Sequence, residues 1–275
     1  MSHDAPVPGY EPMLAAYHRA FEAELRAMVN SLPLAEGRAV LDMACGDGAY
    51  SPWLADRVGP TGRVVAVDVS PDYLELAREA AARSPHASIV EFACAPIEAL
   101  PFDDGTFDLC WCAQSLYSLP DPVAALRHML RVARPGGFVA VLEGDTLHDV
   151  ILPWPVEVEL SARAAELKAL AEGSDRPRKF YVGRQLRRLF REAGLVQVRS
   201  TTFAADRSAP LGPDERTFFA EYLKRLARSI AKTLDGPIRR EFDALVDPGS
   251  PAFLLDDPDL TATCIGHVVL GRKPT

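Results

Sequence analysis

The types and spacing of four residues in the first quarter of the chain suit a ligand-binding turn: Asp42, Gly46, Gly48 and Asp68. The glycines let the backbone approach a ligand closely, and the helix that follows them presents unpaired N–H groups. Asp68 comes about twenty residues after the turn, at the end of an apolar run, where a carboxylate can accept hydrogen bonds from both hydroxyls of a ribose. The pattern predicts a site for a nucleoside-containing ligand, a class that includes NAD.

Details of this turn distinguish between cofactor classes. The third glycine of the dinucleotide-binding pattern G-x-G-x-x-G allows close helix packing, but Ser51 stands at that position. Asp42 stands four residues before the first glycine, where a carboxylate would be unfavourable beside the phosphates of NAD but would suit an ammonium group. S-adenosylmethionine carries an α-ammonium and a sulfonium, whereas NAD carries two phosphates. These residues favour S-adenosylmethionine, with an NAD-dependent oxidoreductase as the alternative.

Alternating strand and helix patterns position the turn. Short apolar runs predict strands at 39–41, 64–67, 88–93, 107–112 and 138–142. Helices are expected between them, at 52–58, 71–82 and 122–132. Strands that alternate with helices at this spacing form βαβ units with right-handed crossovers and a parallel sheet. With further strands at 195–204 and 262–271, expected to pair as an antiparallel edge, the sequence predicts an α/β fold with a doubly wound, mostly parallel, seven-stranded sheet.

Regions outside these units also have helical patterns. Apolar residues from Met13 to Met28 recur at helical spacing and predict an N-terminal lid helix within residues 1–35. Residues 144–181 and 205–260 exceed the roughly two to six residues of an ordinary loop and hold helical patterns, so we expect helical cap insertions there. Further helices are expected at 156–172, 183–193, 214–233 and 237–246. No Ser/Gly-rich linker interrupts the chain, so residues 1–275 are expected to form one domain around a cofactor-binding core at 36–143.

The composition argues against several classes of function. With 30 Lys and Arg against 38 Asp and Glu, the net charge of −8 disfavours a nucleic-acid partner, because that affinity rests on clustered basic residues. Charges and prolines interrupt every apolar run before the roughly 18 residues that a membrane span needs. The opening residues lack the basic start and apolar stretch of a secretory signal, so a cytoplasmic location is expected. The five cysteines show no zinc-binding spacing, and no metal site is expected.

Segments of the core resemble a known enzyme family. Residues 36–145 contain, in order, VLDMACGDG, VVAVDVS and IEALPFDDGTFDLCWCAQSLYSLPDPVAALRHMLRVARPGGFVAVLE. These segments resemble the Rossmann-like class I S-adenosylmethionine-dependent methyltransferases, particularly the ubiquinone/menaquinone-biosynthesis-like branch. The resemblance implies S-adenosylmethionine as the cofactor. It also implies these contacts: Asp42 with the methionine amino group, Ala44, Gly46 and Gly48 around the methionine portion, Asp68 with the ribose, Val69 beside the adenine, and Cys112 and Ala113 at the end of the fourth strand.

One segment departs from the family pattern. Where many relatives have an acid after the third strand that accepts the adenine amino group, this chain has Pro96. The resemblance then leaves the adenine contact to backbone groups, with Ile97 as the candidate. N-terminal helices of this branch often cover the cofactor, which makes Tyr10, Tyr17 and His18 candidate lid contacts. Ordinary helix packing is the alternative for all of them.

The predicted reaction is methyl transfer to a small-molecule acceptor. The cofactor carries the activated methyl group, so the protein mainly aligns the acceptor and needs no obligatory base motif. No His and Asp pair is apparent in the sequence, which favours an acidic oxygen or an activated carbon over nitrogen as the acceptor atom. His148 follows the fifth strand on the ligand-binding side and is the candidate catalytic base, with helix capping as its alternative. A non-catalytic cofactor-binding protein of the same fold is a further alternative.

Overall fold

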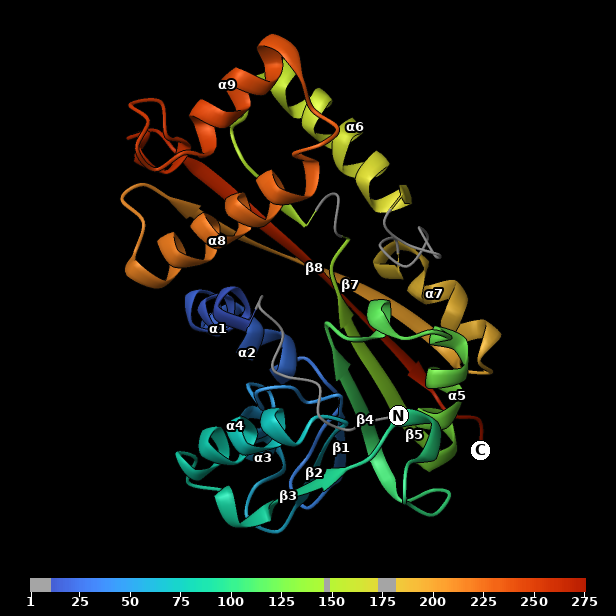
Figure 1. Ribbon diagram of the computed structural model, residues 1–275. Coiled ribbons are helices and arrows are strands. Elements are labelled where there is room, and N and C mark those ends of the chain that lie inside the picture. Colours follow the sequence, from blue (N-terminus) through green and yellow to red (C-terminus); the bar gives the residue numbers. More distant parts are fainter. Residues whose placement is uncertain (1–10, 146–148, 173–181) are drawn as a thin grey trace.

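The computed structural model describes residues 11–145, 149–172 and 182–275, and within them eight strands form one sheet (Figure 1). The strands are β1 (Ala39–Met43), β2 (Arg63–Asp68), β3 (Val90–Cys94), β4 (Phe107–Ala113), β5 (Ala133–Glu143), β6 (Val150–Ile151), β7 (Val196–Ser208) and β8 (Thr261–Arg272). Strands β1 to β5 are parallel and lie in the order β3-β2-β1-β4-β5. The predicted α/β fold with a doubly wound, mostly parallel sheet is confirmed.

The C-terminal strands add the antiparallel part of the sheet. Strand β8 pairs with β5 on one side and with β7 on the other. The two C-terminal strands therefore pair as predicted, but β8 lies inside the sheet and β7 forms its outer edge. The short strand β6, which no sequence pattern indicated, adds to the expected seven and pairs with β8 through Val150 and Cys264.

Helices cover both faces of the sheet. Their bounds are α1 (Glu11–Ala20), α2 (Glu22–Asn30), α3 (Ser51–Val58), α4 (Pro71–Ala82), α5 (Pro122–Val132), α6 (Val156–Glu172), α7 (Val182–Glu192), α8 (Pro213–Ile230) and α9 (Gly236–Val246). Successive side chains of a strand point to opposite faces. In β1, Val40 accordingly belongs to a buried cluster with Leu54 of α3, whereas Leu41 belongs to a second cluster with Leu126 of α5. No helix in the described residues is long and apolar enough to cross a membrane.

The N-terminal region forms two helices instead of the single one expected from its apolar pattern. Helix α1 ends at Ala20 and α2 begins at Glu22, and Phe21 between them has φ −117° and ψ 22°. The buried Phe21 ring lies edge-to-face with Phe218 and Phe219 of α8, at centroid distances of 5.5 and 6.4 Å. Packing against a segment distant in the sequence accounts for the break.

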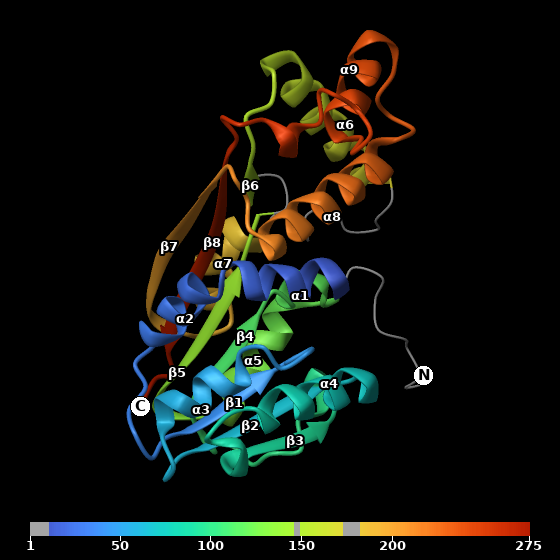
Figure 2. The same cartoon turned by 90° about the vertical axis from the view of Figure 1, so that its left-hand side faces the viewer.

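Helices α6, α8 and α9 form a group beyond the β6 end of the sheet (Figures 1 and 2). Trp154, just before α6, stacks on Phe242 of α9 with ring centroids 5.7 Å apart. Thr233, just after α8, donates a hydrogen bond of 3.2 Å to the backbone oxygen of Ala165 in α6. The first turn of α8 reaches α1, where Asp214 accepts a hydrogen bond from Arg19. This helical group therefore stands over the same edge of the sheet as α1.

Gly48 allows the turn after β1 to pack closely on α4. Its φ is +75°, and an added Cβ would lie 2.7 Å from Cα and Cβ of Ala77. We expect Gly48→Ala to lower the free energy of unfolding by about 2–5 kcal/mol, because overpacking adds to backbone strain. In the control Gly236→Ala, φ is +65° but no atom lies within 4 Å, which leaves strain of about 1–2 kcal/mol. Urea unfolding compares the variants, and equal losses would contradict the packing role.

Candidate active site

A cavity of about 700 Å³ opens at the carboxyl ends of β1, β2, β4 and β5. The strand order reverses between β1 and β4, which is where open α/β sheets bind ligands. The volume falls in the range of small-molecule sites, about 300–1,000 Å³. The expected cofactor residues that line the cavity are Tyr17, Asp42, Ala44, Gly46, Asp68, Val69, Ile97 and Ala113. The fold thus brings residues of the glycine turn, residues at the ends of β2 and β4, and Tyr17 of α1 to a single site.

Other residues proposed from the sequence do not line this cavity. Gly48 packs against Ala77 of α4. Cys112 is fully buried in the hydrophobic cluster that faces α5. Both residues pack behind the cavity wall, and their implied ligand contacts stay predictions. His148 and Tyr10 fall outside the described residues, so a catalytic role for His148 stays a prediction.

Asp68 ties the glycine turn to the start of α4. Its Oδ2 accepts a hydrogen bond from the backbone N–H of Gly46 at 3.0 Å, and its Oδ1 accepts one from the N–H of Ser70 at 2.9 Å. Ser70 in turn caps α4 by accepting the N–H of Tyr73 at 3.4 Å. Each carboxylate oxygen has a further lone pair. Asp68, buried at the cavity wall, can therefore hold the loops in place and still accept two hydroxyl donors.

Asp42 is a buried carboxylate near the end of β1, and no cationic side chain in the described residues pairs with it. Its Oδ2 accepts a hydrogen bond of 2.6 Å from the hydroxyl of Ser51, which is itself fully buried. Burial raises the pKa of Asp42 to about 7, and the hydrogen bond from Ser51 offsets only part of that effect. A ligand ammonium would stabilise the ionised form. Ser51, read from the sequence only as a missing glycine, thus orients Asp42.

Strained backbone marks the two adjacent strand ends. Ala44 follows β1 with φ +53°, and Gln114 follows β4 with φ +51°. Such conformations cost about 1–3 kcal/mol in residues with a side chain and concentrate at functional sites. Both residues line the cavity, and the hydroxyl of Tyr50 donates a 3.4 Å hydrogen bond to Oε1 of Gln114 across it.

A histidine on α1 joins the glycine turn. The Nδ1 of His18 lies 3.2 Å from Oδ2 of Asp47, and the ring stands edge-to-face with Tyr50 at 5.4 Å. Burial would raise the pKa of Asp47, but the hydrogen bond and charge of His18 outweigh it and hold that pKa below its usual value. This pair was not apparent in the sequence, because its two residues are 29 positions apart and only the fold brings them together. The pair fastens α1 over the turn.

Comparison with known proteins identifies the family. Residues 41–141 match a family model described as a methyltransferase domain. The demethylmenaquinone methyltransferase of Staphylococcus aureus is 29% identical over 188 residues, which cover 65% of this chain and 76% of that protein. These matches support an S-adenosylmethionine-dependent methyltransferase of the class I type. The predicted enzyme class and cofactor are confirmed, as is the resemblance to the ubiquinone/menaquinone-type branch.

Solved structures share the fold of this methyltransferase. A candidate methyltransferase of Bacillus halodurans superimposes with a TM-score of 0.57 at 18% identity, over 91% of this chain and 99% of that one. The YcgJ protein of Bacillus subtilis gives a TM-score of 0.56 at 16% identity, over 92% of this chain and 99% of that one. At these identities the likeness concerns the architecture alone.

Asp42, Gly46 and Asp68, which we call the polar cradle, fit S-adenosylmethionine. Asp42 would face the ammonium of the cofactor with a buried carboxylate, and Asp68 would accept its ribose hydroxyls. An added Cβ at Gly46 would meet no atom within 4 Å, so the backbone there borders open space that a ligand can fill. Val69 leaves 51% of its surface exposed beside Asp68 and offers an apolar flank for the adenine.

Glu143, at the end of β5, is a second carboxyl group with an altered pKa. It is 2% exposed and lines the cavity, and its Oε1 accepts the backbone N–H of Tyr117 at 3.2 Å. Burial raises the pKa of Glu143 to about 8, although backbone hydrogen bonds counteract the shift. The methyltransferase therefore has a buried carboxyl group in the cavity wall whose pKa lies well above its usual value.

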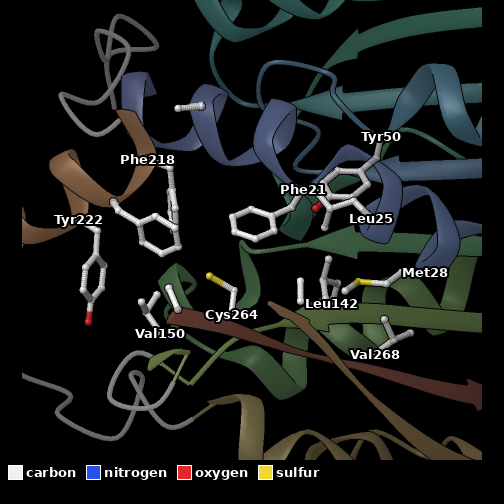
Figure 3. Close-up of a cluster of buried hydrophobic side chains, with 14 of the residues drawn as sticks. Phe21, Leu25, Met28, Tyr50, Leu142, Val150, Phe218, Tyr222, Cys264 and Val268 are labelled. Carbon is white, nitrogen blue, oxygen red and sulfur yellow. The ribbon is translucent and has the colours of Figure 1, made fainter. Parts of the chain in front are cut away.

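The opposite wall of the cavity is largely apolar and aromatic. It includes Phe218 and Tyr222 of α8, Val150 of β6 and Cys264 of β8. Figure 3 shows these side chains at one end of the buried cluster, and Tyr50 at the other. The cavity of the methyltransferase thus has a polar cradle at the strand ends and an apolar chamber under α8.

Proposed function

We propose that this methyltransferase transfers the methyl group to an oxygen or a ring carbon of a hydroxylated aromatic small molecule. The observation that carries the proposal is the continuity of the cavity, in which the polar cradle opens directly into the chamber lined by Phe218 and Tyr222. Aromatic walls offer favourable stacking and edge contacts to a flat acceptor. The Staphylococcus aureus relative, whose name gives demethylmenaquinone as its substrate, supports a quinone-related acceptor.

In this proposal the chain contributes alignment and exclusion of water. Bound S-adenosylmethionine supplies an activated methyl group on a sulfonium. Asp68 would hold the ribose of the cofactor and Asp42 its amino group, on either side of the sulfonium. The chamber walls hold the acceptor atom in line with the methyl–sulfur bond, which accounts for much of the rate gain in such displacements. An acidic phenol or an activated ring carbon needs only modest help to lose its proton.

The regions 144–181 and 205–260 would act as a cap over the acceptor, and residues 1–35 as a lid over the cofactor. Support comes from α8, which lines the chamber, and from the pair between His18 of α1 and Asp47 of the glycine turn. His148, proposed from the sequence as the base, belongs to the first of these cap regions. A closed cap would also disfavour nucleic-acid acceptors, as the net charge does.

Methyl transfer to a defined acceptor panel tests the proposal. The protein is incubated with S-adenosylmethionine labelled in the methyl group and with phenols, catechols, hydroquinones and hydroxybenzoates, each beside the arylamine of the same size. We expect label in one or more hydroxylated compounds, on oxygen or carbon, and none in the matched amines. The Asp68→Ala variant, which should lose the cofactor, controls for contaminating activity. Label confined to amines, or absent from every compound, would contradict the proposed acceptor class.

A further inference from the structure

The chamber wall holds an arginine that the cradle does not use. Arg225 is half-buried and, among the described residues, is the only lysine or arginine that lines the cavity. It makes no ion pair within the described part of the chain, and its Nε is closed off from solvent without a hydrogen-bond partner. Its guanidinium lies 5.4 Å from the centre of the Tyr222 ring. The carboxylates of Asp149 and Glu166 lie near enough to interact with this cation, but neither forms an ion pair with it among the described residues.

The carboxylate of Asp149 and the hydroxyl of Tyr222 lie beside this arginine. Oδ1 of Asp149 is closed off from solvent and has no hydrogen-bond partner among the described residues, whereas the hydroxyl of Tyr222 interacts with Arg163. Burial raises the pKa of Asp149 to about 6, although the charges of Arg225 and Arg163 counteract the shift. Buried polar groups are nearly always hydrogen-bonded. The joint occurrence of Oδ1 of Asp149 and Nε of Arg225 on one cavity wall points to a polar ligand that satisfies both.

The neighbouring charges already have partners of their own. Arg163 of α6 lies 3.4 Å from Oε2 of Glu166 and donates a 2.9 Å hydrogen bond to the backbone oxygen of Val150. Glu166 thus has an ion pair with Arg163, and the charge of Arg225 also lowers the pKa of Glu166. Arg225 and Asp149 remain as an opposite pair that shares a wall without an ion pair between them.

The location of this arginine assigns it to the acceptor. Phe218, Tyr222 and Arg225 follow one another at helical spacing on a single face of α8. The C-terminal half of α8, which holds Arg225, runs toward α6 and α9 and away from α1 (Figure 2). Asp42 and Asp68 lie at the carboxyl ends of β1 and β2. Arg225 thus lies on the cavity-lining face of α8, about one turn after Tyr222.

We propose that Arg225 and Asp149 recognise an acceptor that carries both a carboxylate-type anion and a hydroxyl group. The guanidinium of Arg225 binds the anion, in the bidentate manner that suits its planar geometry. Asp149 accepts a hydrogen bond from the hydroxyl, and Tyr222 contributes a further contact. The proposal rests on the proposed function and narrows its acceptor class to hydroxyaromatic acids. A purely apolar acceptor would leave Nε of Arg225 and Oδ1 of Asp149 without hydrogen-bond partners.

Calorimetric titration with two acceptors of equal shape tests the anion contact. The probes are 3,4-dihydroxybenzoate and its neutral amide, 3,4-dihydroxybenzamide, each titrated into protein saturated with S-adenosylhomocysteine at pH 8. We expect the acid to bind about 10- to 100-fold more tightly than the amide, as for a charge-assisted hydrogen bond. Arg225→Met should abolish this preference, and Arg225→Lys should retain part of it. Arg228→Met, on the exposed side of the same helix, is the matched control and should keep it.

The hydroxyl contact has its own test with the same probes. Asp149→Asn should weaken binding of the acid and of the amide by a similar factor, because both carry the hydroxyls. It should leave benzoate, which has none, unaffected. Equal loss of benzoate affinity would show that Asp149 acts on the fold of the chamber and would overturn its assignment.

Several results would overturn the proposal as a whole. These are equal binding of acid and amide to the unmodified protein, binding of neither, or an Arg225→Met variant that loses S-adenosylhomocysteine instead of the acid. Methyl transfer separates this failure from that of the proposed function. Methylation of neutral hydroxyaromatics that is insensitive to Arg225→Met would refute the anion site alone. Arginine-dependent acid binding without methylation of any compound would refute the acceptor chemistry and leave the anion site standing.

Discussion

Asp68→Ala is expected to weaken the binding of S-adenosylhomocysteine by about 2–4 kcal/mol, or roughly 30- to 1,000-fold. The substitution removes a charged acceptor from two ribose hydroxyls, each worth about 1.5–3 kcal/mol without full additivity. It also frees the N–H groups of Gly46 and Ser70 that the carboxylate now holds. Isothermal titration calorimetry at pH 8 measures the change.

Asp72→Ala is the matched control for that experiment. Asp72 is an exposed acid in the first turn of α4, close in sequence to Asp68 but absent from the cavity wall. Its removal should leave affinity nearly unchanged. Circular dichroism and thermal unfolding verify that both variants are folded. A folded Asp68→Ala protein with unaltered affinity would mean that the ribose is held elsewhere.

The affinity for S-adenosylhomocysteine is expected to rise with pH up to about pH 7 and then to level off. In the ligand-free protein, burial raises the pKa of Asp42 to about 7, so the group is largely protonated at pH 6. The ammonium of the ligand favours the ionised form, so binding below pH 7 releases a proton and affinity gains up to about tenfold per pH unit. Asp42→Asn removes the titrating group. This variant should bind weakly, with a loss of about 10- to 100-fold at pH 8, and its affinity should be flat in pH.

Ser51→Ala provides an internal check on the pH dependence. Its hydroxyl donates to Oδ2 of Asp42 and opposes the rise in the pKa of that carboxyl. Removing the hydroxyl should therefore raise the pKa of Asp42 further and shift the affinity curve to higher pH. Titrations between pH 5.5 and 8.5, in buffers with different ionisation enthalpies, count the protons released. Retention of the full pH dependence in Asp42→Asn would assign it to another group, of which Glu143 is the foremost.

The core of the fold was predictable because its signals are local. Ser70 and Pro71 form a local helix-start signal after β2, and the hydroxyl of Ser70 accepts the N–H of Tyr73. Each parallel strand could be located from a short apolar run, since strands buried on both faces read as continuous hydrophobic segments. The cradle at Asp42, Gly46 and Asp68 follows from the same logic, because a turn between a strand and a helix is encoded within a few residues. These features needed no knowledge of distant contacts.

Features that depend on distant contacts were not visible in the sequence. The break at Phe21 arises from packing against α8, and the pair of His18 and Asp47 joins a helix to a turn that follows it by 29 residues. Gly48 was assigned to the ligand, although a Cβ there would meet α4 at 2.7 Å. Arg225 had no local pattern to mark it, because an arginine on an amphipathic helix resembles any solvated residue. Its position in the cavity follows only from how α8 crosses the site.

A crystal structure of the protein with S-adenosylhomocysteine tests the central claim most directly. The account predicts that both ribose hydroxyls lie within hydrogen-bond distance of the Asp68 carboxylate and that the amino group lies beside Asp42. The chamber bounded by Phe218, Tyr222 and Arg225 should stay open for the acceptor. A cofactor whose ribose lies away from Asp68, or whose body fills that chamber, would contradict the account.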